Sequence, residues 1–372
     1  MEARPRCEID FERSCNKSEF TLITYKSGLK KFMRFCQVEN MEDLLEADQK
    51  QIQMKIEDYV YYLTGKINPN SVPTQLAPVF LFYDISDVIL NKVKIKRMYP
   101  AKRKVQGFRA YTREQIKEML SNSKKKRSKA MVLTFVSSGI RIGGLVGLRM
   151  KDIIDVPNSK CKCLTIYHDE NEEYITFLTP EASKALDEYF QERLKAGEVF
   201  SYETPVFARN ENQVRDFANT KRSVNVLNVN PVSRTAVCHS IEYMLASQDR
   251  PKETGGRYKV PITYGFRKYY NTVLKLSDKC NISIAEKLFG HSVTVKLDNH
   301  YLPIGMEELF KEFSKNIAEL TIREEERQLL KIQKLETGLK EEEDKTTENK
   351  LLKEQVEVLK LRMERMELSG NV

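Results

Sequence analysis

Three short motifs lie close together in residues 262–303: Tyr264-Gly265-Phe266-Arg267, Leu288-Phe289-Gly290-His291 and Asn299-His300-Tyr301. Residues 281–289 have the apolar spacing of a short amphipathic helix, which begins at Asn281 or Ser283 and ends at Gly290. His291 then follows the helix end, where its ring can face a pocket. The chain therefore offers an arginine, a histidine and a tyrosine in one short segment.

These three residue types together indicate phosphoryl chemistry. The guanidinium of Arg267 is always charged, and its fork of N–H groups matches phosphate oxygens. The phenol of Tyr301 can act as a covalent nucleophile. A histidine between them can hydrogen-bond the same phosphate.

A second arginine motif, Ser138-Gly139-Ile140-Arg141, lies upstream. It follows an apolar run at residues 130–136, which predicts a buried helix that Gly139 ends. Another helix is predicted to begin around Leu145. Arg141 is therefore expected at a helix–helix elbow and not on a free surface.

Taken in order, these motifs resemble the tyrosine recombinase (phage integrase) family. The form G-F-R-K followed by G-H and a tyrosine is most similar to its archaeal members. The family pattern is an arginine in a T/S-G-x-R elbow, a lysine on a β-hairpin, H-x-x-R, and then G-H with a tyrosine nine or ten residues later. The resemblance covers roughly residues 15–320.

The resemblance implies DNA strand exchange without metal, cofactor or nucleotide. Tyr301 would attack a scissile phosphate and form a 3′-phosphotyrosine with release of a 5′-hydroxyl. Arg141 and Arg267 would hold the non-bridging oxygens, where charge develops. His291 would donate a hydrogen bond to the same phosphate.

Three positions depart from the family pattern. Tyr264 stands where the histidine of H-x-x-R is usual, and a phenol with a reference pKa of about 10 is a poor base near neutral pH. Gly144 stands where an acid usually follows the first arginine. The predicted hairpin turn, residues 168–173, contains no lysine. We expect Lys162, or less readily Lys160, to supply the missing cation, and His168 is a further candidate proton donor.

Charge distribution favours a nucleic-acid partner. The formal net charge is +9 over 372 residues. From Ala318 onward there are 14 acidic and 11 basic side chains, so residues 1–317 carry +12. Such an excess is typical of proteins that bind a polyanion, and here the expected partner is double-stranded DNA at attachment sites.

The seven cysteines are scattered and include no C-x-x-C pair, which indicates reduced thiols and no zinc motif. The N-terminus lacks an apolar signal core, and no apolar run approaches the roughly 20 residues of a membrane span. We therefore expect a cytoplasmic, nucleoid-associated protein without membrane contact.

The chain divides by composition into four expected parts. Residues 1–98 contain three apolar stripes at helical spacing and form a helical, DNA-clamping (core-binding) domain in the resembled family. Residues 99–108 are a linker, residues 109–318 the catalytic domain, and residues 319–372 a charged C-terminal helix or coiled coil. The third N-terminal helix is expected at residues 74–90.

The linker region is strongly basic, with no acid between Val88 and Glu114. We expect phosphate contacts along this stretch rather than a merely solvated hinge. The candidate DNA-binding residues are Lys96, Arg97, Lys102, Arg103, Lys104 and Arg109.

The catalytic domain is predicted to combine helices with one small sheet. Thr112 and Gln115 form a capping box that opens a helix. Residues 163–167 and 174–178 flank a turn-like segment, residues 168–173, and are predicted to be the two strands of a hairpin. The fold class is therefore mostly α with a small β-hairpin or sheet.

The tail carries a heptad seam at Leu352, Val356, Leu359, Met363 and Met366. Two or three heptads are marginal for a free coiled coil, so the seam either self-associates or folds back. The resemblance implies a tetramer on DNA. The amphipathic residues 306–317 are expected to be the helix exchanged between protomers.

Two other functions fit the same residues. One is a non-catalytic DNA-binding protein of the same fold, against which the intact Arg141, Arg267, His291 and Tyr301 set argues. The other is a DNA-relaxing enzyme similar to type IB topoisomerases, against which the small helical domain argues. Site-specific recombination is the function we expect.

Overall fold

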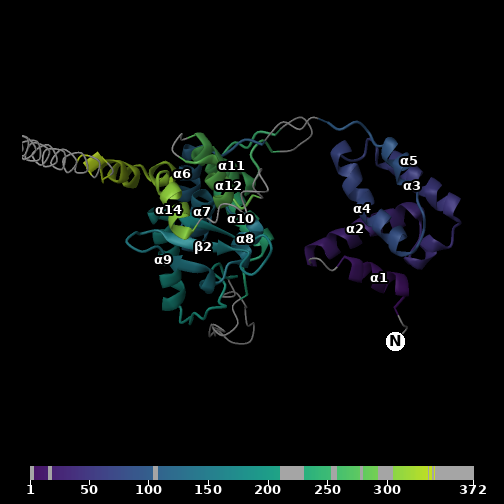
Figure 1. Ribbon diagram of the computed structural model, residues 1–372, viewed down its shortest axis with the longest axis horizontal. Coiled ribbons are helices and arrows are strands. Elements are labelled where there is room, and N and C mark those ends of the chain that lie inside the picture. Colours follow the sequence, from purple (N-terminus) through teal and green to yellow (C-terminus); the bar gives the residue numbers. More distant parts are fainter. Residues whose placement is uncertain are drawn as a thin grey trace, which may run out of the picture. The chain divides into compact units, whose positions relative to one another are not determined.

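The computed structural model describes residues 4–15, 19–103, 108–209, 230–252, 258–276, 280–291 and 305–333, with 335, 336 and 339. The chain forms two compact units, Met1–Gly107 and Phe108–Val372 (Figure 1). Within the described residues, no helix is both long and apolar enough to cross a membrane.

The first unit is a helical bundle. Its elements are α1 (Arg6–Ser14), α2 (Glu19–Cys36), η1 (Glu42–Leu45), α3 (Gln49–Leu63), η2 (Pro69–Ser71), α4 (Val72–Ile85) and α5 (Lys92–Arg97). Its core contains the edge-to-face aromatic pairs Phe32–Tyr59 and Phe11–Phe82. The predicted apolar stripes of α2 and α3 face this core, with Phe32 and Ile56 fully buried.

The third predicted helix is shorter than expected. It ends at Ile85, and Asp87 then adopts a positive φ of 57°, which a helix cannot continue. The side chain of Asn91 caps a separate helix, α5, by accepting a hydrogen bond from the Lys94 amide at 3.0 Å. Part of the basic stretch is therefore helical and packed on the first unit through Ile95, which is buried.

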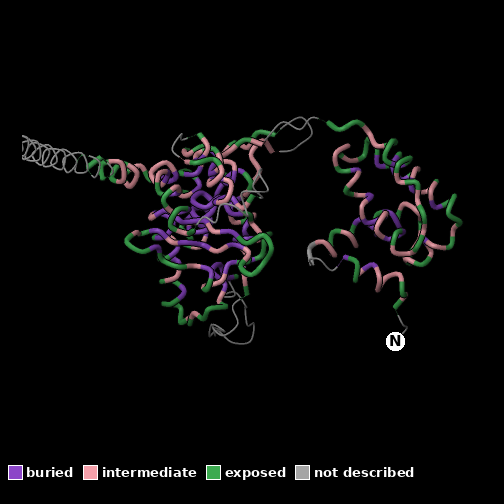
Figure 2. Tube along the Cα trace, in the orientation of Figure 1, coloured by how far each residue is buried: buried purple, intermediate pink, exposed green. Residues whose placement is uncertain are grey.

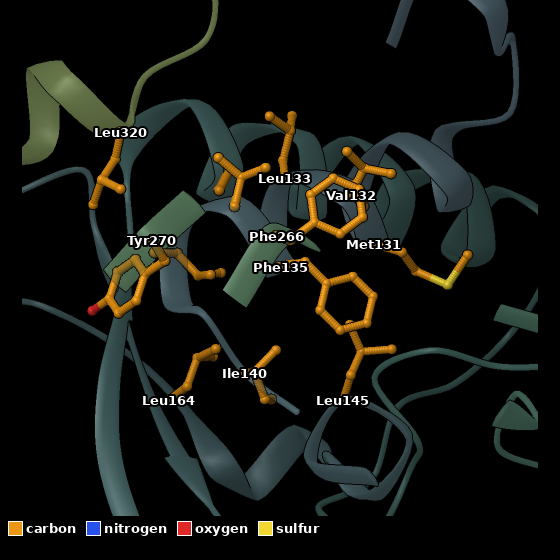
Figure 3. Packing of buried hydrophobic residues seen from close by; sticks show 14 of the residues in the cluster. Met131, Val132, Leu133, Phe135, Ile140, Leu145, Leu164, Phe266, Tyr270 and Leu320 are labelled. Atoms are coloured by element: carbon orange, nitrogen blue, oxygen red, sulfur yellow. The ribbon is translucent and has the colours of Figure 1, made fainter. Parts of the chain in front are cut away.

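The second unit begins with α6 (Arg113–Asn122), and the predicted capping box between Thr112 and Gln115 is present. Next come α7 (Lys126–Ser138), α8 (Ile142–Gly147) and η3 (Met150–Asp152). Helix α7 is buried on every side from Ala130 to Ser138 and packs against α9 (Pro180–Lys195) and α11 (Tyr264–Leu276). It is the centre of the core: Phe135 stacks on Phe266 of α11 at 5.8 Å (Figure 3).

A three-stranded antiparallel sheet covers one side of this core. Its strands are β1 (Ile153–Asp155), β2 (Lys162–Ile166) and β3 (Tyr174–Leu178), in the order β1-β2-β3. The β2–β3 hairpin pairs Ile166 with Tyr174 next to the turn and Lys162 with Leu178 at the opposite end. The predicted hairpin is confirmed, and β1 is an addition that the sequence analysis did not foresee. The fold class is confirmed as mostly helical with one small sheet.

The remaining helices are α10 (Arg234–Met244), α12 (Ile282–Leu288), α14 (Met306–Ser314) and α15 (Ile317–Leu320). Helix α14 packs on its own chain, with Phe313 5.4 Å from the Phe177 ring of β3. Leu320 and Ile322 lie in the core. Figure 2 shows the buried positions gathered in the centre of this unit. The packed domain thus continues past residue 318, where the tail was predicted to begin.

Candidate active site

Arg267 joins two segments that are far apart in the sequence. It lies on the first turn of α11 and is 4% exposed. Its Nη1 donates to the Gly139 carbonyl at 2.6 Å, and its Nη2 donates to the Phe289 carbonyl at 2.7 Å. The guanidinium also lies over the Phe289 ring. One buried cation therefore holds the elbow after α7 against the end of α12.

Arg141 lies beside it as the N-cap residue of α8. Its side chain is exposed, and Nη1 is 3.4 Å from the Gly290 carbonyl oxygen. Burial lowers the pKa of Arg267, and the nearby charge of Arg141 lowers it further. In the described part of the chain neither guanidinium forms an ion pair. Two adjacent cations without a carboxylate partner favour a bound anion.

His291 follows directly on the two carbonyls that the arginines contact. Gly290 ends α12 with a φ of 62°, and the His291 amide donates back to the Glu286 carbonyl at 3.1 Å. The ring packs edge-on against Phe289 at 4.6 Å, and the side chain is 40% exposed. The helix end therefore places an accessible imidazole directly after the two carbonyls that the arginines contact.

Sequence reasoning missed two residues next to this site. Glu286 accepts a hydrogen bond from His291 Nδ1 at 2.6 Å, and it also binds Lys275. Tyr174 of β3 packs so closely on Gly290 that a Cβ there would lie 2.4 Å from its ring. Burial raises the pKa of Tyr174, and the nearby charges of Arg267 and Arg141 oppose that rise. The only sequence signal for Glu286 was its position on the predicted helix, five residues before His291.

Tyr264 begins α11, one helical turn before Arg267. Its side chain is 46% exposed, and its ring packs edge-on against Phe108 at 5.8 Å. The helix therefore places a hydroxyl and the buried guanidinium on the same element. Tyr264 has both a packing contact and an accessible surface.

The packing around Gly144 explains why no acidic residue stands three positions after Arg141. It is buried in α8, and a Cβ added there would lie 2.7 Å from Ile166 and 3.0 Å from Ile140. No acidic side chain fits without moving the sheet. Support for the arginines comes instead from the carbonyls of the α12 end.

The structure does not bring Lys162 to the arginines, and the expectation that it reaches the site needs correction. It lies at the end of β2 away from the turn, paired with Leu178. Its ammonium is held by Asp155 at 2.7 Å and Asp187 at 3.1 Å. Those two acids, one on β1 and one on α9, form ion pairs with the Lys162 ammonium at this end of the strand.

His168 occupies the turn in which the family places its lysine. Its Nδ1 is 2.8 Å from the buried Asp152, whose other oxygen accepts the Arg149 amide at 2.7 Å. The hydrogen bond to Asp152 raises the pKa of His168. The turn thus holds a titratable cation at its base.

Comparison with known proteins agrees with this arrangement. The model of the phage integrase family matches residues 109–308. The chain belongs to the phage integrase family. It is a tyrosine site-specific recombinase.

Solved structures share the fold of this recombinase. The XerH site-specific recombinase bound to difH substrate, in a pre-cleavage complex, has a TM-score of 0.53 at 12% identity over 81% of this chain and 82% of that one. The Tn1549 transposon integrase in complex with transposon right end DNA has a TM-score of 0.50 at 12% identity over 83% and 98%. The comparison with curated proteins found no match.

The candidate DNA-binding residues of the recombinase that the structure describes are all exposed, namely Lys96, Arg97, Lys102, Arg103 and Arg109. Lys92 and Lys94, in the same basic stretch, instead pair with Asp84 and Glu57. Lys104 and the predicted nucleophile Tyr301 lie outside the described residues.

Proposed function

We propose that this recombinase cuts and rejoins double-stranded DNA at attachment sites through a 3′-phosphotyrosine on Tyr301. The observation that carries this is the pair of uncompensated guanidiniums at the α12 end, with His291 next to them. A phosphodiester placed there is held by two cations while negative charge develops on its non-bridging oxygens. Tyr264, exposed on the same helix as Arg267, supplies a further hydrogen bond to that phosphate.

The energy of the broken bond is kept in the phosphotyrosine. Religation to a new 5′-hydroxyl therefore needs neither ATP nor a metal. The exposed Lys96, Arg97, Lys102, Arg103 and Arg109, together with Lys104, hold the phosphates flanking the cleavage site. The G-F-R-K and G-H motifs support an affinity with archaeal integrases of mobile elements, acting at the nucleoid in the cytoplasm.

Recombination of two duplexes requires four strand cleavages, so we propose a tetramer on paired sites. Helix α14 packs on its own chain here. Exchange of this helix between protomers therefore requires release of the Phe177 contact. In the described part of the tail, the apolar residues Ile332 and Leu335 are exposed and available for association.

The test is to trap covalent adducts. The full chain is incubated with plasmid and with sheared genomic DNA of its source, quenched with detergent, and the protein-linked 3′ ends are sequenced. We expect adducts at a defined sequence for the wild type and none for Tyr301→Phe, which still binds DNA. A wild type without adducts indicates a non-catalytic DNA-binding protein. Adducts at scattered sequences, with plasmid relaxation and no strand exchange, indicate a topoisomerase-like enzyme.

A further inference from the structure

The cleavage step lacks an evident proton acceptor. The phenol of the attacking tyrosine must lose its proton as it bonds to phosphorus. The residue usual at the start of H-x-x-R is Tyr264 here, and a tyrosine hydroxyl is a hydrogen-bond donor and not the common general base of proteins. An imidazole titrates in the right range and is the common general base of proteins.

The surroundings of His291 fix which nitrogen carries its proton. Glu286 lies on α12, 15% exposed, with one carboxylate oxygen 2.6 Å from His291 Nδ1 and the other bound to Lys275 of α11. Partial burial opposes ionisation of Glu286, but the hydrogen bonds from Lys275 and His291 outweigh it and lower its pKa. An ionised carboxylate only accepts hydrogen bonds, so Nδ1 must be the donor. In the neutral ring, Nε2 then carries a free lone pair.

We propose that Glu286 is the positioning residue for His291, and that His291 Nε2 accepts the proton of the attacking tyrosine. This inference rests on the proposed function. As the Tyr301 oxygen bonds to phosphorus, its proton moves to Nε2 and the ring becomes an imidazolium. The bond from phosphorus to the 5′-oxygen breaks, and that oxygen takes a proton from a solvent water. The imidazolium then gives its proton to the hydroxide left behind, so the step ends with a neutral ring, a 5′-hydroxyl and no net change in protons. Religation runs the same steps in reverse.

Glu286 has the chemistry that this role requires. Its negative charge stabilises the imidazolium formed during the step, and Lys275 keeps the carboxylate ionised and fixed in place. Other charged or titratable groups come from every element packed around the pair. They are Arg267 of α11, Tyr174 of β3, Glu312 of α14 and Arg141 before α8.

The substrate for the test is a nicked duplex carrying the cleavage site mapped by adduct sequencing. Single-turnover cleavage is measured from about pH 5.5 to about pH 8.5, which spans the reference histidine pKa. We expect His291→Gln to lower the rate by about 10²- to 10⁴-fold, because glutamine hydrogen-bonds but accepts no proton. Glu286→Gln, which keeps the shape and loses the charge, lowers it by about 10- to 100-fold.

Glu312→Gln is the matched control. Glu312 is also a shielded glutamate next to α12, where it accepts the Asn281 amide at 3.0 Å and binds Lys315, without touching His291. We expect this variant to cleave at the wild-type rate. Equal losses for Glu286→Gln and Glu312→Gln overturn the positioning role, because they indicate only damage to α12.

A fluorinated tyrosine at position 301 separates proton acceptance from hydrogen-bond donation. Its more acidic phenol needs less help from a base, so the difference in cleavage rate between wild type and His291→Gln is expected to narrow. The fall in cleavage rate towards low pH, which is expected where a base must be unprotonated to act, disappears in His291→Gln. An unchanged gap, or a wild-type pH profile in His291→Gln, overturns the inference. The proposed function stands in that case as long as the wild type forms adducts and Tyr301→Phe does not.

Discussion

Arg267 has a structural role in holding two carbonyls, and the proposed function gives it a chemical role as well. Two of its five N–H groups donate to the carbonyls of Gly139 and Phe289, which fixes the guanidinium plane before any DNA arrives. Such pre-organisation is what electrostatic stabilisation of a transition state requires. The same contacts hold together the two loops that carry Arg141 and His291.

Arg267→Lys tests this double role. A lysine has the charge but lacks the planar fork, so it cannot bind both carbonyls. We expect the free energy of unfolding to fall by about 1–3 kcal/mol, since a buried carbonyl loses its partner. Cleavage is expected to fall by about 10²- to 10³-fold. Urea unfolding and suicide-substrate cleavage measure the two effects.

Arg141→Lys is the comparison for stability, because Arg141 is exposed. Its unfolding free energy is expected to stay within about 0.5 kcal/mol of the wild type. Cleavage is still expected to fall, since in the proposed function both arginines hold the scissile phosphate. If both variants lose equal stability, Arg267 is not the clamp between the two loops.

Gly290 has two separate reasons to be glycine. Its φ of 62° is in the left-handed region, and an added Cβ would lie 2.4 Å from the Tyr174 ring. Gly197 has a φ of 90° but no atom within 4 Å of such a Cβ. We expect Gly197→Ala to cost about 1–2 kcal/mol of unfolding free energy and Gly290→Ala about 1–3 kcal/mol more, measured by thermal or urea unfolding. Equal costs would show that Tyr174 moves aside freely.

At the scale of elements, the β2–β3 hairpin is fixed to the rest of the domain through its turn. His168 bonds to Asp152, which follows α8, and that hydrogen bond raises the histidine pKa. A raised histidine pKa means that the folded state binds the proton more tightly than the unfolded state. The resulting stability is fully present below the unfolded pKa of about 6.5 and is lost as pH rises through the folded value.

His168→Gln makes this pH dependence measurable. We expect wild type to exceed the variant in unfolding free energy near pH 6 and the difference to shrink near pH 8.5, when both are compared by urea denaturation. NMR titration of the His168 ring gives the pKa directly. A difference that grows with pH contradicts the ion pair with Asp152.

Helices α14 and α15 close the second unit at its C-terminal end. Glu181 at the start of α9 is buried and accepts the amides of Ile322 and Arg323 at 2.7 and 3.1 Å. Leu320 and Ile322 are each 1% exposed. The chain therefore stays part of the domain until it passes these residues.

Two truncations separate this closing segment from the tail. Deletion of residues 319–372 removes Leu320 and Ile322 and is expected to cost roughly 3–6 kcal/mol, from about 1.5–3 kcal/mol for each large side chain. Deletion of residues 340–372 keeps Leu320 and Ile322 in place, and we expect it to leave single-site cleavage unchanged and to reduce synapsis. Urea unfolding and gel assays of paired-site complexes measure these outcomes. Undiminished synapsis in the shorter deletion contradicts an assembly role for the tail.

At the scale of the whole molecule, net charge drives DNA binding. Each phosphate contact contributes about 0.9 to the slope of log affinity against log salt. Replacement of Lys102, Arg103 and Lys104 by alanine is therefore expected to reduce that slope by up to about 2.7, measured by fluorescence anisotropy. Replacement of Lys92 and Lys94 is the control, because Asp84 and Glu57 already neutralise them. If both sets of replacements reduce the salt slope equally per removed charge, the linker residues make no specific phosphate contacts and form a solvated hinge.

The sequence by itself determined the elements whose signals are local. The capping box at Thr112, the helix end at Gly139 and the strand at residues 174–178 were all readable, because caps, glycine turns and strands depend on near neighbours in the chain. The order of Arg141, Arg267 and His291 likewise indicated phosphoryl chemistry. Tyr301 remains a prediction from spacing alone.

Only the tertiary structure decided which groups meet. Lys162 forms ion pairs with Asp155 and Asp187, which come from other elements. No sequence pattern within its own strand predicts those partners. Gly144 excludes an acid because Ile166 packs over it. Glu286 supports His291 because the left-handed Gly290 turns the chain back over the helix end. Such pairings depend on how helices and sheet pack, and packing joins residues that the chain keeps apart.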